Sequence, residues 1–534
     1  MLCHIRAMNL SRAAESLRIY FDYSMFRASD SIMATGNRGC RLGVLDQRSL
    51  RFSCLLQARL CRIFGDKQAA RLLLSECVQQ AQNHDMVCLR MAMVELAALD
   101  AMPPNDLDLK ALTEEKSTDT LLTTDELLRM INRVADTETR IDGADDHRDA
   151  VTSTDESEQL FEQLNALAHL MTAITAARRC KSPRVVEEGL ERAMRCTSGP
   201  DSGARARLIS DAAVATTSSV RLRHGFALAT QSLATSLVET NYSDGCAPRH
   251  ETEAHAIAGV NMVYAAAMMG EWDRVTTMLG RLKLYYTQEL NWQAAHYVNL
   301  CDRIILFDTT ILRGQWDKCV PVLEDIETLD AGEAALRRAI LLAAQNELSS
   351  ARNLLESIYS KYETPTTVFL HMRLRLQLAM LLSAECRWSA AVEMLQGVHE
   401  EALGVGQRNI AAMALRRIGV VQMMSGDHEM AIEKLDECRK DIRSSCSVLE
   451  NAILSIAFAV AHSHTGSKNE RLRFLNKARA QCRQAGAVLF EKFVLQEIAL
   501  CYHECGDMDE RDDIASEFAA IDDRYAGHFD WKLV

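Results

Sequence analysis

Proline, glycine and aromatic residues are scarce in this chain of 534 residues, which has 7 prolines, 24 glycines and 6% aromatics. Sheets are enriched in β-branched and aromatic residues, and that enrichment is missing. Ala, Leu, Arg and Glu dominate instead, and all four are strong helix formers. Because single cores rarely exceed ~250–300 residues, the length predicts either several domains or one elongated repeat structure. The composition favours an all-α repeat structure.

Long hydrophobic runs are also missing. The nearest candidate, 256–269, is short for a membrane span and includes Asn261. The first ten residues, MLCHIRAMNL, lack the apolar stretch and cleavage site of a secretory signal. The 17 cysteines mostly fall within apolar helical patterns, so we interpret them as small buried hydrophobes in a reducing compartment. We expect a soluble chain with no membrane partner.

The net charge of −13 excludes a generally basic surface of the kind that binds nucleic acid. Residues 113–158 hold 14 acidic and 5 basic side chains, so the rest of the chain is nearly neutral. A local basic groove remains compatible with that near-neutral body. The segment 103–158 is acidic and rich in Ser and Thr, which is typical of a disordered linker. Within it, 125–134 has helical spacing and is either a transient helix or a docking helix.

Catalytic signatures are absent from the sequence. It has no P-loop, no Gly-x-Ser-x-Gly elbow and no Cys-x-x-Cys pair. The close glycine pair Gly404 and Gly406 lacks a third glycine at position 409, which is Asn409. We therefore predict no enzyme, with no catalytic or cofactor-binding residues and no small-molecule substrate.

Two clusters of potential metal ligands were weighed. His250 and Glu251 with His255 resemble a zinc-protease motif but have one residue too many, and five helical positions rotate the imidazoles ~140° apart. Cys501 and Cys505 do share a helix face, with His503 between them, but they fall on its packing side. We interpret both clusters as structural and predict no metal site.

A repeat dominates the C-terminal half. Turn signals at positions 386, 426, 466 and 506 are 40 residues apart each time. Around Gly426, small residues at Gly419 and Ala431 allow two helices to cross closely, and Leu435 continues the apolar face of the second helix. We expect the turn glycine to end the first helix and Asp427 to cap the second.

This pattern is the tetratricopeptide arrangement, whose standard period is ~34 residues. The extra residues predict longer helices or longer loops between repeats. Upstream of these repeats, looser matches to the same pattern have their turns near the following positions: 65, 181–183, 224–225, 270, 314 and 346. Three tryptophans fall two positions after such turns and are predicted to pack between helices: Trp272, Trp316 and Trp388. Pro321 is expected to kink its helix or delay the start.

The resulting fold prediction is an α-solenoid of tetratricopeptide-like helical hairpins. Helical repeats at 1–102 precede the linker 103–158, and a superhelix follows over 159–534. Residues 29–49 are predicted to form an inserted loop. The apolar tail 528–534 is expected either to fold back as a cap or to dock on a partner, and the cap is favoured.

Several segments together resemble subunit 5 of the anaphase-promoting complex (cyclosome), a mitotic ubiquitin ligase. They are 336–355 (LRRAILLAAQNELSSARNLL), 300–308 (LCDRIILFD) and 62–89, which ends in Asp-x-Val-Cys-Leu. The resemblance runs over nearly the whole chain, although the family normally carries a further N-terminal helical domain.

The resemblance implies a non-catalytic scaffold that lies beside subunits 1, 4 and 15, in the nucleus and cytoplasm, during the metaphase–anaphase transition and mitotic exit. Two alternatives stay open. The chain could be a helical-repeat adaptor of another assembly, or the sensor part of a repeat-containing signalling ATPase. The second would need a P-loop domain that this sequence does not contain.

Overall fold

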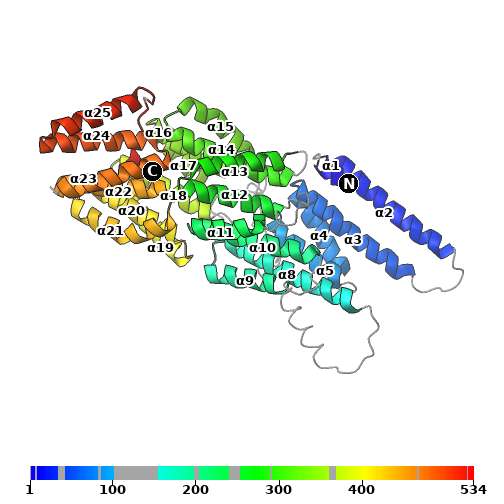
Figure 1. The fold of residues 1–534 in the computed structure, drawn as a ribbon. Helices are drawn as coiled ribbons and strands as arrows, with labels where there is room; N and C mark the ends of the chain where they lie inside the picture. Colours follow the sequence, from blue (N-terminus) through cyan, green and yellow to red (C-terminus); the bar gives the residue numbers. More distant parts are fainter. Residues whose placement is uncertain are drawn as a thin grey trace. The chain divides into compact units, whose positions relative to one another are not determined.

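The computed structural model describes residues 2–6, 9–33, 42–81, 86–100, 154–197, 204–239, 253–288, 292–359, 368–465, 468–525 and 527–533. Every regular element within these ranges is a helix, and the ranges contain no strand (Figure 1). The predicted all-α class is therefore confirmed.

The described residues form two compact units. The first takes in residues within 1–178, 184–213 and 288–292, and the second takes in 179–183, 214–287 and 293–534. The first contains α1 (Leu2–Arg6), α2 (Leu10–Met33), α3 (Leu42–Ile63), α4 (Lys67–Ala81), α5 (Met86–Asp100), α8 (Thr154–Arg178), nearly all of α9 (Pro183–Arg195) and the start of α10 (Ala204–Arg223).

The second unit continues with fifteen α-helices in the described part of the chain and a short tail helix. Its elements are α11 (Ala227–Glu239), α12 (Glu253–Met268), α13 (Trp272–Tyr285), α14 (Trp292–Ile311), α15 (Trp316–Leu329), α16 (Ala331–Ala344), α17 (Leu348–Tyr359), α18 (Val368–Ala384), α19 (Trp388–Gly404), α20 (Arg408–Ser425), α21 (His428–Ser445), α22 (Val448–Thr465), α23 (Lys468–Ala485), α24 (Val488–Cys505), α25 (Met508–Asp522) and the 3₁₀ turn η1 (Trp531–Leu533).

The predicted loop over 29–49 is wrong in its bounds. Helix α2 runs to Met33 and α3 starts at Leu42, because no proline interrupts either flank and their residues tolerate helix. Residues 34–41 lie outside the described part. So do 101–153, and with them the helix considered at 125–134, so the linker and the domain limits at 102 and 159 stay predictions.

The hairpin α20–α21 has the predicted close crossing. Gly419, Ala431, Leu435 and Cys438 are all buried. A Cβ atom on Gly419 would lie 3.0 Å from the Leu435 side chain and 3.2 Å from the Ala431 carbonyl oxygen. The small residue is thus required by backbone proximity.

Long helices account for the 40-residue period. Each of the five helices from α20 to α24 has 18 residues. The first of the two predicted explanations, longer helices, is therefore the correct one. Long helices give each hairpin a broad apolar face, which stacks into one continuous core from α14 to α24.

The described turns at 386, 426 and 506 follow the predicted positions, whereas the turn predicted at 466 lies outside the described residues. Left-handed backbone occurs at turn glycines such as Gly426 (φ +99°), but also at Cys180, Asn346 and Cys386, which have side chains. The capping prediction is only partly correct. Asp66 accepts from the Ala69 amide at 3.0 Å, whereas the Asp427 side chain makes no cap bond, and its helix starts through the backbone bond from Ala431 N to Asp427 O.

Pro321 and the turn tryptophans depart somewhat from expectation. Helix α15 begins at Trp316, so Pro321 lies in its second turn and does not delay the start. Trp272, Trp316 and Trp388 pack against the core as predicted, but all three are half-buried rather than enclosed. The indole Nε1 of Trp272 donates to the Gln484 carbonyl at 3.0 Å, more than 200 residues away.

Such long-range contacts recur regularly within the second unit. The turn before Pro183 meets the α19–α20 turn, the α10–α11 turn meets the end of α21, and the α12–α13 turn meets the end of α23. The helix that precedes the turn is α8, α10 or α12 in the first member of each pair and α19, α21 or α23 in the second, so the two are always eleven labels apart. Successive coils of the superhelix therefore touch, turn against turn.

The contact at Gly225 is the tightest of these. Its φ is +83°, and a Cβ atom there would lie only 1.6 Å from the Ser445 carbonyl oxygen. Two hydrogen bonds flank it, from His224 Nδ1 to the Gly406 carbonyl (3.0 Å) and from Asn409 Nδ2 to the Arg223 carbonyl (2.7 Å). Glycine is required here by conformation and by space.

Candidate protein-binding surface

The C-terminal tail folds back onto the superhelix. Phe529, Trp531 and Leu533 are all buried, with exposed fractions of 4%, 1% and 6%. The Phe529 ring meets Phe490 at 5.7 Å and Trp316 at 6.4 Å between centroids. Burial of three large side chains confirms the favoured prediction, that the tail folds back.

The tail contacts helices before the last hairpin as well as the last hairpin itself. Trp531 packs against Phe493 of α24 at 6.0 Å, and the Leu533 carbonyl accepts from Gln377 Nε2 of α18 at 2.8 Å. Meanwhile α25 itself has no buried residue. The tail therefore ties α24 to the earlier helices α15 and α18, and leaves the outer helix of the last hairpin uncovered.

Lys492 fixes the approach of the tail. Its ammonium group donates to the carbonyls of Tyr525 (2.7 Å) and Gly527 (3.0 Å), and it pairs with Asp522. The side chain is only 9% exposed, so its charge needs all of these partners. One buried cation thus organises the segment between α25 and η1.

A cleft of about 360 Å³ lies beside the seated tail. Its walls are Val460, Ser463 and His464 of α22, Phe493 and Glu497 of α24, and residues 528–532. Glu497 is paired with Arg471 at 2.9 Å, so the carboxylate at the wall is already neutralised. The cleft thus combines aromatic side chains of α24 and the tail with polar groups of α22 and the tail.

Buried ion pairs join neighbouring repeats. Glu333 of α16 binds Arg337 of its own helix and Arg373 of α18, whose second guanidinium nitrogen is 3.2 Å away. Burial alone would raise the pKa of Glu333, but the two guanidinium groups outweigh it and hold that pKa at about 2. The carboxylate is therefore ionised at any physiological pH.

Two further arginines repeat this arrangement. Arg416 of α20 is fully buried and pairs with Glu450 of α22 at 2.8 Å. Arg471 of α23 pairs with Glu497 and with Glu504 of α24. Breaking such a pair leaves an uncompensated buried charge, which costs about 3–5 kcal/mol. These pairs make the spacing between hairpins specific.

The structure shows the burial of the residues in the two candidate metal clusters. His255 is buried in α12, whereas His250 and Glu251 lie outside the described residues. Cys501 is buried on the packing side as expected, but the same prediction for Cys505 is wrong, since Cys505 is exposed, as is His503. Across the residues that the structure describes, no three His, Cys, Asp or Glu side chains are grouped to hold a metal ion. Across those same residues, no helix has the length and apolarity needed to cross a bilayer.

The sequence-based reasoning missed the ion pairs and the basic cleft described below. A signal for the first existed, since Glu333 and Arg373 lie one 40-residue period apart. The basic cleft has no such signal, because Arg439 and Arg473 lie 34 positions apart, as do Arg443 and Lys477, and neither spacing matches the 40-residue period.

Stacked helical hairpins with small residues at each crossing, closed by left-handed turns, define the chain as a tetratricopeptide-type helical-repeat protein. Residues 1–333 match the family model described as the anaphase-promoting complex subunit 5 central TPR domain. Residues 338–534 match the model of the suppressor of spindle checkpoint defect 1 C-terminal domain. The chain belongs to the anaphase-promoting complex subunit 5 family, as the resemblance implied.

Individual relatives agree with the family. Protein gfi-3 of Caenorhabditis elegans is 26% identical over 550 residues, and suppressor of spindle checkpoint defect 1 of the same species is 25% identical over 551. These alignments cover 100% and 99% of this chain and 66% of each relative. Human anaphase-promoting complex subunit 5 is 22% identical over 297 residues, covering 52% of this chain and 38% of that protein. The chain thus spans just under two thirds of the nematode relatives.

Proposed function

We propose that the chain is a non-catalytic scaffold subunit of an anaphase-promoting complex, which holds other subunits in place during the metaphase–anaphase transition and mitotic exit. Family membership over both halves of the chain is the observation that carries this proposal. Subunits 1, 4 and 15 are its proposed neighbours, and nucleus and cytoplasm its proposed locations.

The physical properties of the second unit support a scaffold. Buried ion pairs fix neighbouring hairpins, coil-to-coil contacts fix distant ones, and the tail ties α24 to α15 and α18. A binding surface on such an array is formed before its partner arrives, so little conformational entropy is lost on assembly. Rigidity over a long surface is what a platform requires.

The test is affinity purification of the tagged chain from mitotic cells, followed by mass spectrometry. We expect the other subunits of the complex in near-stoichiometric amounts. Recovery of the folded chain without them refutes the proposal, and recovery with a different stable set of proteins favours the adaptor alternative.

Catalysis is tested separately by ubiquitin transfer in a reconstituted complex. Omitting this chain should lower the yield of assembled complex, and the activity per assembled catalytic module should stay the same. A large loss of activity in a complex that still assembles contradicts the non-catalytic role. Imaging of the tagged chain through the cell cycle tests the two proposed locations.

A further inference from the structure

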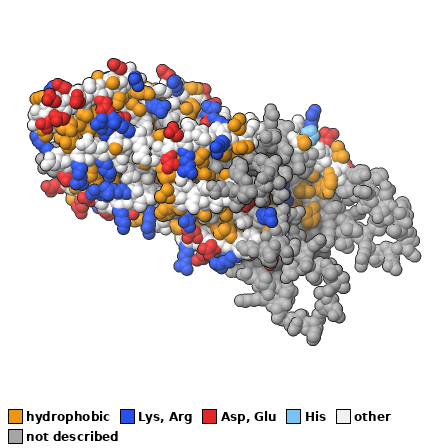
Figure 2. Space-filling view, viewed as in Figure 1, with side chains coloured by type: hydrophobic (Ala, Val, Ile, Leu, Met, Phe, Trp, Pro, Cys, Tyr) orange, Lys and Arg blue, Asp and Glu red, His pale blue; other side chains and the backbone are white. Residues whose placement is uncertain are grey.

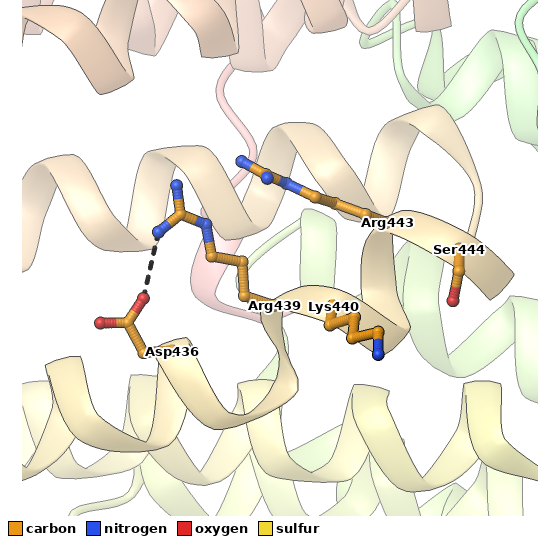
Figure 3. A pocket seen from close by; sticks show the side chains of 5 residues that line it. All are labelled: Asp436, Arg439, Lys440, Arg443 and Ser444. Carbon is orange, nitrogen blue, oxygen red and sulfur yellow. Dashed lines mark hydrogen bonds and ion pairs between the residues drawn. The ribbon is translucent and has the colours of Figure 1, made fainter.

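A basic cleft lies on α21, the second helix of its hairpin. Its volume is about 350 Å³, and it is lined by Asp436, Arg439, Lys440, Arg443 and Ser444, all from α21 (Figure 3). These positions are three, four, seven and eight residues after Asp436, so they share one helix face. Lys and Arg side chains gather over α21 and α23 in the space-filling view (Figure 2).

The neighbouring helix α23 adds two more cations, Arg473 and Lys477. The Arg439 guanidinium carbon lies 5.7 Å from the ring centroid of Phe474, which is on α23, so the two helix faces adjoin. Burial lowers the pKa of Lys477, and the charges of Arg443, Arg439 and Arg473 lower it further. Five cations thus share one small area.

Carboxylates neutralise only part of this charge. Asp436 pairs with Arg439 and Glu470 with Arg473, both at 3.2 Å. Within the described ranges, Lys440, Arg443 and Lys477 form no ion pair. Crowded cations repel one another, and a bound anion would relieve that repulsion.

Aromatic rings hold the arginines in place. The guanidinium carbon of Arg439 is 5.5 Å from the Phe458 centroid, and that of Arg473 is 5.3 Å from the Phe474 centroid. The two rings are themselves stacked, 4.8 Å apart. Because the guanidinium planes are supported, fewer rotamers are lost when their N–H groups bind an anion.

We propose that this basic cleft binds a phosphoserine or phosphothreonine side chain of a partner protein. A phosphate group carries nearly two negative charges and three acceptor oxygens, which matches several cations from two helices. A single carboxylate would satisfy one guanidinium fork and leave the other cations unpaired. The inference rests on the cleft alone and does not depend on the proposed complex.

The test uses the full chain and three fluorescent Gly/Ala-based peptides, identical except for a central phosphoserine, serine or glutamate. Fluorescence anisotropy should show at least tenfold tighter binding of the phosphoserine peptide than of the serine peptide, with the glutamate peptide between them. Arg443→Gln and Lys477→Gln should each weaken phosphopeptide binding by about tenfold, the usual effect of losing one charge-assisted contact.

Lys434→Gln is the matched control, because it removes the same charge from α21 at a lysine that already pairs with Glu437. It should leave binding unchanged, and the melting temperature of all variants should stay within a degree or two of the parent, about the spread of a small surface change. Equal affinity for the phosphoserine and serine peptides overturns the proposal. So does an equal effect of all three substitutions.

A single-stranded oligonucleotide of matched length is the competing polyanion. If it binds as tightly as the phosphopeptide and is equally sensitive to Arg443→Gln, the cleft is a general nucleic-acid patch and the proposal fails. Weaker oligonucleotide binding, insensitive to that substitution, supports a phosphopeptide site.

Discussion

Replacing Gly225 by alanine should destabilise the protein far more than the same change at Gly426. Both glycines have positive φ, +83° and +99°, so alanine meets the same backbone penalty of roughly 1–2 kcal/mol at each. Their surroundings differ. A Cβ on Gly426 has no atom within 4 Å, whereas a Cβ on Gly225 would overlap the Ser445 carbonyl oxygen.

The additional loss at Gly225 follows from the contacts beside it. The backbone oxygen of Ser445 cannot rotate away as a side chain would, so the two turns must separate. Separation breaks the His224–Gly406 and Asn409–Arg223 hydrogen bonds, each with a net value of about 0.5–1.5 kcal/mol. We expect Gly426→Ala to cost about 1–2 kcal/mol and Gly225→Ala about 2–5 kcal/mol.

Urea denaturation followed by circular dichroism gives the two midpoints, and hydrogen exchange locates the loss. Long repeat arrays depart from two-state unfolding, so the exchange data carry the decisive comparison. Gly225→Ala should lower protection at the start of α20 and around 445–448, while Gly426→Ala affects only its own turn. Equal midpoints and equal exchange patterns would show that the coils do not touch in solution.

Three further predictions concern the tail, the buried ion pairs and the thiols. Deleting 528–534 should lower the melting temperature, and Trp531→Ala alone should cost about 3–5 kcal/mol in denaturant unfolding, while the half-exposed Lys532→Ala serves as a near-neutral control. An unchanged melting temperature after the deletion would mean that the tail is not seated. Glu333→Gln should cost about 3–5 kcal/mol at pH 7, because Arg373 loses its carboxylate partner and Arg337 keeps only Asp308, 3.4 Å away. Since the pKa of Glu333 is about 2 when folded and ordinarily 4.5, the parent's advantage is complete above pH 4.5 and should vanish as the pH falls towards 2. A stability difference between parent and variant that does not change with pH would contradict this account. Burial raises the pKa of Cys438 to about 12, so its thiol stays protonated, whereas Cys386 and Cys505 are exposed. Brief iodoacetamide treatment at pH 8 should label Cys386 and Cys505 and spare Cys438, as read by peptide mass spectrometry, and fast labelling of Cys438 would show that its hairpin opens.

Turn positions show how well local patterns predicted the fold. Gly65, Gly270, Gly314 and Gly506 all have left-handed backbone where turns were expected. Cys386 holds the same conformation without being glycine, and it was found because the 40-residue spacing required a turn there. The predicted loop over 29–49 was too long, because α2 continues to Met33 and α3 already begins at Leu42.

The candidate surfaces were less predictable. The buried tail was expected from its apolar composition, but nothing local indicates that Leu533 would reach Gln377. The basic cleft depends on the contact between α21 and α23. In the amino-acid composition its cations are offset by acidic residues nearby in the sequence, so the local net charge does not reveal it. Such sites depend on which helix faces are brought together.

The sequence alone determined the all-helical class, the hairpin as the repeating unit, its period and its turns. Each of these depends on residues close together in the chain, where periodic burial, small crossing residues and turn glycines act locally. Only the tertiary structure decided that turns eleven helices apart touch, that the tail crosses to α18 and that arginines of α21 lie beside cations of α23. These features depend on the small rotation between successive hairpins, which accumulates along the array and is set by packing at every interface.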